Sequence, residues 1–101
     1  MHVIEIFLPL RDNEGRPFAR PLYGRVRQEL VERFGGLTAF SRSPAEGLWT
    51  DDGETMKDGI VIFEVMTDTL DEGWWAQYRR QLEQRFAQDV ILIRAAEVKQ
   101  L

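Results

Sequence analysis

The order of strand-like and helix-like patterns along this chain of 101 residues is the feature that most constrains its fold. Two stretches repeat apolar residues at helical spacing, and four shorter runs are rich in β-branched and aromatic residues. They follow one another as strand, helix, strand, strand, helix and strand. Because each helix carries one apolar stripe, both helices are expected to pack on the same face of one sheet.

The two predicted helices have apolar stripes and clear ends. The stripes consist of Leu22, Val26, Leu30 and Phe34 in the first helix and of Trp75, Tyr78, Leu82 and Phe86 in the second. Pro21 suits the first turn of the first helix, and Gly35 is suited to end that helix in a left-handed conformation. Thr69 and Glu72 form a capping-box pattern that predicts the start of the second helix. Charged residues off the stripes, including Glu29, are expected to be solvated.

Four strands complete the predicted fold. They are expected at Val3–Leu8, Leu37–Ser41, Ile60–Met66 and Val90–Ala95. Leu48 and Trp49 could extend the second strand, and a turn is predicted at 51–53. The helical connections predict that the first and third strands are central, adjacent and parallel, with the second and fourth strands at the edges. The predicted fold class is α+β: a ferredoxin-like βαββαβ two-layer sandwich, with a four-stranded antiparallel or mixed sheet and two helices on one face.

Composition and charge place the chain among globular proteins and exclude several functions. Its length and 44% hydrophobic content fit a single domain over residues 1–101. The net charge of −4 disfavours a polyanionic partner, so no nucleic acid is expected. The absence of cysteine excludes disulfides, zinc–thiolate sites and thiol nucleophiles. Without a signal-peptide pattern or an apolar run of about 20 residues, we expect a cytoplasmic location and no membrane partner.

The sheet face that the helices leave uncovered is predicted to be unusually apolar. Its residues would be Val3, Glu5, Phe7, Ile60, Ile62, Glu64, Met66, Leu92 and Arg94. A solvated face would instead alternate to mostly polar residues. An apolar patch of this extent typically marks an interface or a ligand surface. Burial against a second copy is the favoured interpretation, a small-molecule surface is the second, and a wrong face assignment or a covering loop is the third.

The element order, the chain length and this apolar face resemble the small proteins that pair sheet to sheet as dimeric α+β barrels. The resemblance extends over the whole chain at the level of the fold, and no motif of a particular family matches. It implies a homodimer formed through the uncovered sheet face. Members that are enzymes act on polyketides, haem or small aromatic compounds, and others have no known activity, so the resemblance does not select a function.

Residue types that carry common reactions are scarce. His2 is the only histidine and lies at the terminus, so neither a metal site nor a triad with Ser41 or Ser43 is expected. The acidic clusters at 12–14 and 51–54 lack the spacing of a calcium-binding loop. We therefore predict no metal, no cofactor and no catalytic residue.

The charges on the uncovered face form the remaining candidate site. Glu5 and Glu64 lie on the two predicted central strands, and Arg94 lies on the strand beside the first. If the register brings them level, they share an otherwise apolar surface. Trp49, between the second and third strands, could line a pocket or contact a dimer partner. These four are the predicted ligand-binding or interface residues.

Two functions remain open from the sequence. The favoured one is a homodimeric binding or structural module, with a small molecule as a further partner. The alternative is a small cofactor-independent enzyme, an oxygenase or isomerase, in which Glu5, Glu64 or a tyrosine would carry the acid–base chemistry.

Overall fold

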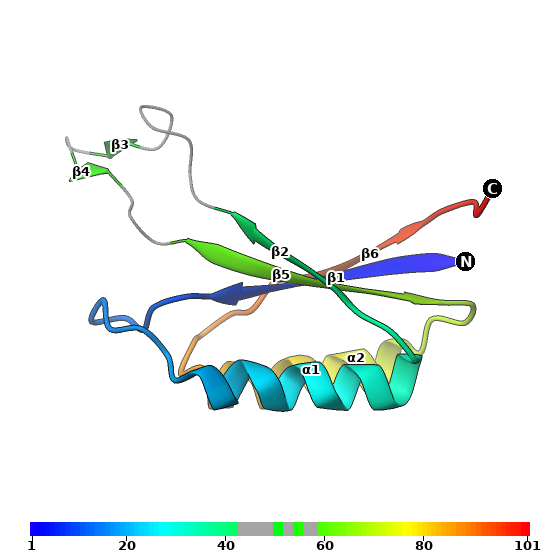
Figure 1. Cartoon of the computed structure of the whole chain (residues 1–101), viewed down its shortest axis with the longest axis horizontal. Coiled ribbons are helices and arrows are strands. Elements are labelled where there is room, and N and C mark those ends of the chain that lie inside the picture. The colour runs from blue at the N-terminus through cyan, green and yellow to red at the C-terminus, as the bar shows by residue number, and fades with distance from the viewer. Residues whose placement is uncertain (43–49, 52–53, 56–58) are drawn as a thin grey trace.

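The computed structural model describes residues 1–42, 50–51, 54–55 and 59–101. Two helices cover one face of a four-stranded sheet (Figure 1). The elements are β1 (His2–Pro9), α1 (Arg20–Phe34), β2 (Thr38–Arg42), β3 (Thr50–Asp51), β4 (Glu54–Thr55), β5 (Ile60–Thr67), α2 (Glu72–Arg85) and β6 (Ile93–Glu97). The ferredoxin-like α+β layout predicted from the sequence is confirmed.

The main sheet has the strand order β2-β5-β1-β6, and each neighbouring pair is antiparallel. The prediction that β1 and β5 are central is confirmed, but the prediction that they run parallel is wrong. Strands joined by a helix do run parallel, yet these are β1 with β2 and β5 with β6, which are not neighbours. The chain reverses between β2 and β5, and this reversal makes the central pair antiparallel.

A second, two-stranded sheet pairs β3 with β4, with Thr50 opposite Thr55 and Asp51 opposite Glu54. The sequence pattern does not predict these strands, because two residues are too few to show an alternation. The predicted extension of the second strand through Leu48 and Trp49 lies outside the described residues.

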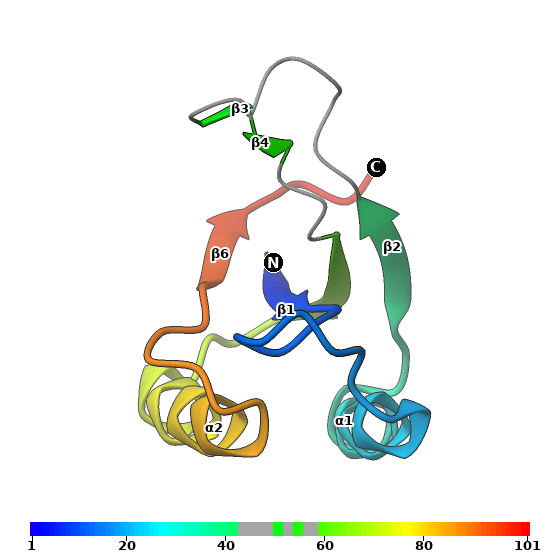
Figure 2. The same ribbon diagram turned by 90° about the vertical axis from the view of Figure 1, so that its left-hand side faces the viewer.

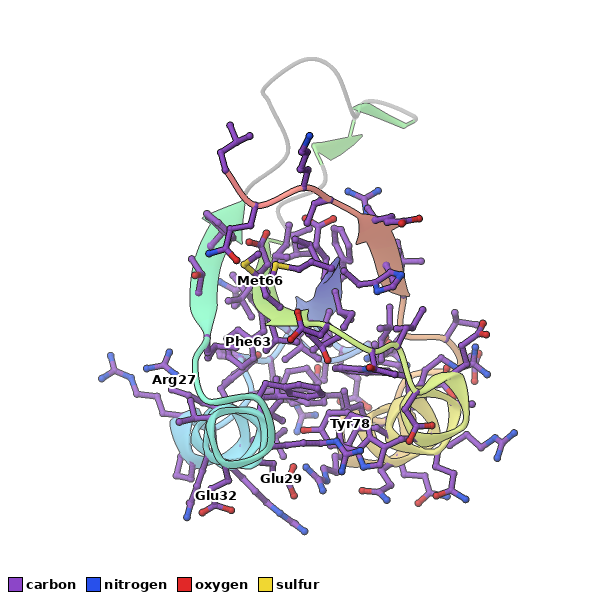
Figure 3. All side chains as sticks on the ribbon, turned by 90° about the vertical axis from the view of Figure 1, so that its right-hand side faces the viewer. Arg27, Glu29, Glu32, Phe63, Met66 and Tyr78 are labelled. Carbon is purple, nitrogen blue, oxygen red and sulfur yellow. The ribbon has the colours of Figure 1, made fainter. Side chains whose placement is uncertain are left out.

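The core lies between the main sheet and the helices. Along β1, Ile4, Ile6 and Leu8 are buried, and the residues between them stay partly exposed. On β5, Phe63 points toward the helices and Met66 points to the opposite side (Figure 3). The helical residues in the core are Val26, Leu30, Trp75, Tyr78, Leu82 and Phe86, with Leu22 and Phe34 partly buried against them. Both predicted helical stripes are therefore confirmed.

Helix α1 ends as predicted, but α2 begins at a different cap. Gly35 closes α1 with a φ of 81°, and its N–H donates to the Val31 C=O at 2.8 Å. The N-cap of α2 is Asp71 rather than Thr69, because the Asp71 carboxylate accepts the Trp74 N–H at 3.1 Å. An aspartate caps a helix at least as well as a threonine does, so the capping-box prediction is wrong by two positions.

Strand β6 begins later than the predicted start at Val90. The Ile91 N–H donates to Glu83 Oε2 at 3.0 Å, so a side chain of α2 takes this backbone group in place of a neighbouring strand. Hydrogen bonding with β1 begins where the Phe7 N–H donates to the Leu92 C=O at 3.0 Å. Ile91 is still buried in the core, as its position in the apolar pattern predicts.

The main sheet is curved, and its edge strands β2 and β6 rise on either side of β1 and β5 (Figure 2). The face away from the helices, which we call the open face, is therefore concave. The last residues of the chain cross above this face from β6 toward β2 (Figure 2). At the start of this crossing, the Val98 N–H donates to the Met1 C=O at 2.9 Å.

The cap of α1 generates a stability prediction. Gly35→Ala should destabilise the protein by about 1 kcal/mol, because a side chain at positive φ is strained by more than the unfolded chain loses in entropy. Gly36→Ala is the matched control, since Gly36 has no positive φ and an added Cβ there meets nothing within 4 Å. Urea melts of both variants measure the difference, and equal midpoints would contradict the assigned role of Gly35.

Candidate functional site

Cross-strand register arranges the open-face side chains in rows across the sheet. Glu5 lies opposite both Glu64 on β5 and Arg94 on β6, and Glu64 lies opposite Thr38 on β2. We call these four residues the charged row. The adjacent apolar row consists of Phe40, Ile62, Phe7 and Leu92.

An ion pair occupies one end of the charged row. The Arg94 Nε donates to Glu5 Oε1 at 2.8 Å, and the Arg94 guanidinium carbon lies 4.9 Å from the centroid of the Phe7 ring. Both contacts hold the guanidinium over the sheet while its side chain stays 58% exposed. Glu64 is partly buried and has no ion-pair partner among the residues that the structure describes.

The apolar row crosses all four strands of the main sheet. Ile62 at its centre is only 1% exposed, and Phe40 and Phe7 lie opposite it on the neighbouring strands. Phe40 and Leu92 at the two ends remain exposed. The open face therefore presents an apolar band next to a row of two carboxylates and one guanidinium.

Three of the four predicted site residues lie on the described part of the open face, and the fourth lies outside the described residues. The structure brings Glu5, Glu64 and Arg94 level with one another, as the sequence-based hypothesis requires. Trp49 lies outside the described residues. Chemically, the charged row offers one neutralised carboxylate and one carboxylate that can still pair with a cation or accept a proton.

A second polar cluster lies between the helices, where the sequence predicts only solvated charges. Arg85 of α2 donates from both Nη atoms to the Glu29 carboxylate of α1, at 2.6 and 2.9 Å. The Tyr78 hydroxyl donates to the same carboxylate at 2.9 Å. Glu29 and Tyr78 both lie in the space between the helices (Figure 3). The prediction that Glu29 is solvated is therefore wrong.

The ionisation states of this cluster follow from its contacts. The hydrogen bonds from Arg85 hold the pKa of Glu29 below its usual range. Burial, reinforced by the bond to Glu29, raises the pKa of the Tyr78 hydroxyl. Glu29 is therefore an ionised carboxylate, Arg85 a charged guanidinium and Tyr78 a protonated phenol. This arrangement ties α1 to α2, and we assign it a structural role. The sequence signal for it is Tyr78 itself, because a buried tyrosine hydroxyl needs a partner.

Among the described residues, the two larger grooves lie outside the open face. One, of about 430 Å³, runs between the helices and includes Trp74, with the Arg33 guanidinium carbon 4.1 Å from the centroid of a Trp74 ring. The other, of about 400 Å³, runs between α2 and β6. Within the described parts of the chain, no three acidic or histidine side chains gather to hold a metal ion, and no helix could cross a membrane.

Comparison with known proteins shows the fold alone. No family model matches the chain, and no curated protein matches it. A solved structure of a phage SAM lyase in complex with S-methyl-5'-thioadenosine is similar, with a TM-score of 0.57 and 15% sequence identity. The likeness covers 95% of this chain and 80% of the lyase chain. At this level of identity it supports the α+β architecture and carries over no residue of the lyase.

The cluster between the helices generates a prediction about pH. Because the folded pKa of Glu29 is lowered, its stabilising contribution is present above its unfolded pKa and disappears as the pH falls through the folded value. Glu29→Gln should lower the free energy of unfolding by about 1 kcal/mol at pH 7, allowing for solvent screening, and by much less near pH 3.

Glu32→Gln is the control for this measurement, because Glu32 is exposed on the same helix. It should change the free energy of unfolding by less than about 0.5 kcal/mol at either pH. Urea melts at the two pH values provide the comparison. A loss for Glu29→Gln that is equally large at both would contradict a contribution from its charge.

Proposed function

We propose that this protein is a homodimeric binding or structural module that self-associates through its open sheet face. The observation that carries the proposal is the apolar row, which runs uninterrupted across the four strands from Phe40 to Leu92. Phe40 and Leu92 at its ends are exposed, Phe7 is partly exposed, and Ile62 is buried between them. Apolar side chains gathered in one band are typical of an interface, whereas isolated ones are normal on a surface.

The shape of the open face and the symmetry of a two-fold dimer support a second copy as the occupant. A two-fold interface uses the same patch twice, so one apolar row can be buried against the other. The concave sheet suits this pairing, because two curved sheets that face each other enclose a common interior (Figure 2).

Charge also supports self-association. Arg94 is paired with Glu5 through one nitrogen and is more than half exposed, so its other donors remain available. In a two-fold dimer, Arg94 of each copy can reach Glu64 of the other. The pairing would neutralise the carboxylate that lacks an ion-pair partner among the described residues, and it would keep the charged row from opposing burial of the apolar row.

The test compares two lysine substitutions at equally exposed apolar residues. Phe40 on the open face is 42% exposed, and Val31 on α1 is 41% exposed. Phe40→Lys should raise the dissociation constant of the dimer about tenfold or more, since it places a charge inside the interface. Val31→Lys should leave it unchanged. Sedimentation equilibrium at micromolar concentration measures both constants, and a Phe40→Lys protein that associates like wild type would overturn the proposal.

A second candidate, a small cofactor-independent enzyme, is favoured by one feature of the charged row. Glu64 is a partly buried carboxylate beside apolar side chains, and such a group can act as a general base. The fold likeness adds a concrete substrate to try, because the similar phage protein is a SAM lyase.

Incubation of the purified protein with SAM tests the enzyme candidate on this substrate. If the protein is a binding or structural module, S-methyl-5'-thioadenosine should not form faster than in buffer alone, as measured by liquid chromatography. Formation that Glu64→Gln abolishes and Glu14→Gln preserves would favour the enzyme.

A further inference from the structure

The outer edge of β6 carries backbone groups that no other described strand uses. β6 pairs with β1 alone and lies at the end of the strand order. The Leu92 C=O accepts the N–H of Phe7 on β1, and the Val98 N–H donates to Met1, which directly precedes β1. Because backbone groups along a strand point to alternate sides, Ile93, Ala95 and Glu97 direct their N–H and C=O groups outward.

The groove between α2 and β6 lies directly beside this edge. Its lining includes Trp75 and Arg79 of α2 and Ile93 of β6. Along β6 the side chains of Ile93, Ala95 and Glu97 share the helix-facing side, because strand side chains alternate and Ile93 packs against the core. An added strand would therefore place alternate side chains over this groove.

We infer that β6 of a second copy pairs antiparallel with this edge, centred on Ala95. In this register Ala95 faces Ala95 of the other copy, and Ile93 faces Glu97. Each of the three outward-facing residues of one strand then lies opposite an outward-facing residue of the other strand. Each such pair can exchange two backbone hydrogen bonds. The small side chain of Ala95 lies on the two-fold axis, where the two copies approach most closely.

The charges on the two elements favour a second copy in this register. Glu97 of one copy would lie beside Ile93 of the other, and Ile93 and Arg79 line the same groove. Arg79 is half-exposed, and its ion pair among the described residues is long, 3.8 Å from its Nε to Glu83 Oε2, so it can turn to the incoming carboxylate. The two-fold axis forms this contact twice. A register shifted to bring Arg94 opposite Arg94 would lose hydrogen bonds and oppose like charges.

This inference goes beyond the proposed function, because it uses the edge of the sheet and not its open face. The two interfaces use different surfaces, and where their two-fold axes cross at right angles they would together assemble four copies. A variant of one interface should then leave the dimer formed by the other.

A proline substitution tests the edge directly. Ala95→Pro removes an outward N–H that β1 does not use, so an edge strand tolerates it while the added strand loses a bond. Wild type should sediment as four copies at micromolar concentration, Ala95→Pro as two, and the control Ala95→Val, which keeps the N–H, as four. A folded Ala95→Pro protein that associates like wild type would overturn the inference.

A charge exchange tests the register and does not depend on the folding of the proline variant. Arg79→Glu and Glu97→Arg should each weaken the edge association about tenfold, and the double variant should recover it. Circular dichroism establishes that each variant is folded. Single variants without effect, or a double variant no better than either single one, would contradict the contact between Arg79 and Glu97.

The two interfaces fail in distinguishable ways. If Phe40→Lys has no effect and Ala95→Pro halves the assembly, the edge inference stands and the face proposal fails. If Phe40→Lys dissociates the protein and Ala95→Pro changes nothing, the edge inference is overturned and the face proposal stands. A wild-type monomer would overturn both.

Discussion

Burial of the two helices against one face of the sheet is the interaction on which the rest of the structure depends. It draws Ile4, Ile6 and Leu8 of β1 into the core and, through the strict alternation of a strand, turns Glu5 and Phe7 to the other side. A register slip of one residue would bury Glu5 without a partner, so the same packing that stabilises the core determines which side chains form the open face.

The antiparallel register then places side chains from different strands in common rows on the open face. Because Glu5 faces Glu64 on one side and Arg94 on the other, charges from three strands collect in one row, and the apolar side chains collect in the next. Neither row is visible as a motif, since its members are far apart in the chain. Topology and strand pairing determine which positions form such a row, but not which residues occupy them. A fold likeness at 15% identity therefore says nothing about its residues.

The sequence predicts the elements, the layers and the residues of the open face, because each depends on a local period. Errors arise where several groups compete for one role. Asp71 caps α2 in place of Thr69, the Glu83 carboxylate accepts the N–H of Ile91 before β6 begins, and Arg85 pairs with Glu29, which is only partly exposed. Each outcome depends on a contact between residues whose distance in space the sequence pattern does not contain. The direction of the central strands differs from the prediction for another reason: the two strands on either side of a helix run parallel, but in this sheet they are not neighbours.

The two arginine–glutamate pairs of this protein show how the same chemistry serves different ends. Arg85 is 13% exposed, holds Glu29 through two bonds and shares that carboxylate with a tyrosine, so exchange for another partner would leave partly buried groups unsatisfied. Arg94 is 58% exposed and holds Glu5 through one bond, so water can replace any contact it gives up. Partly buried and joined by two hydrogen bonds, the first pair fastens the helices together. Exposed and unsaturated, the second retains donors for an external carboxylate, and it lies beside the apolar row where a second copy would bring one.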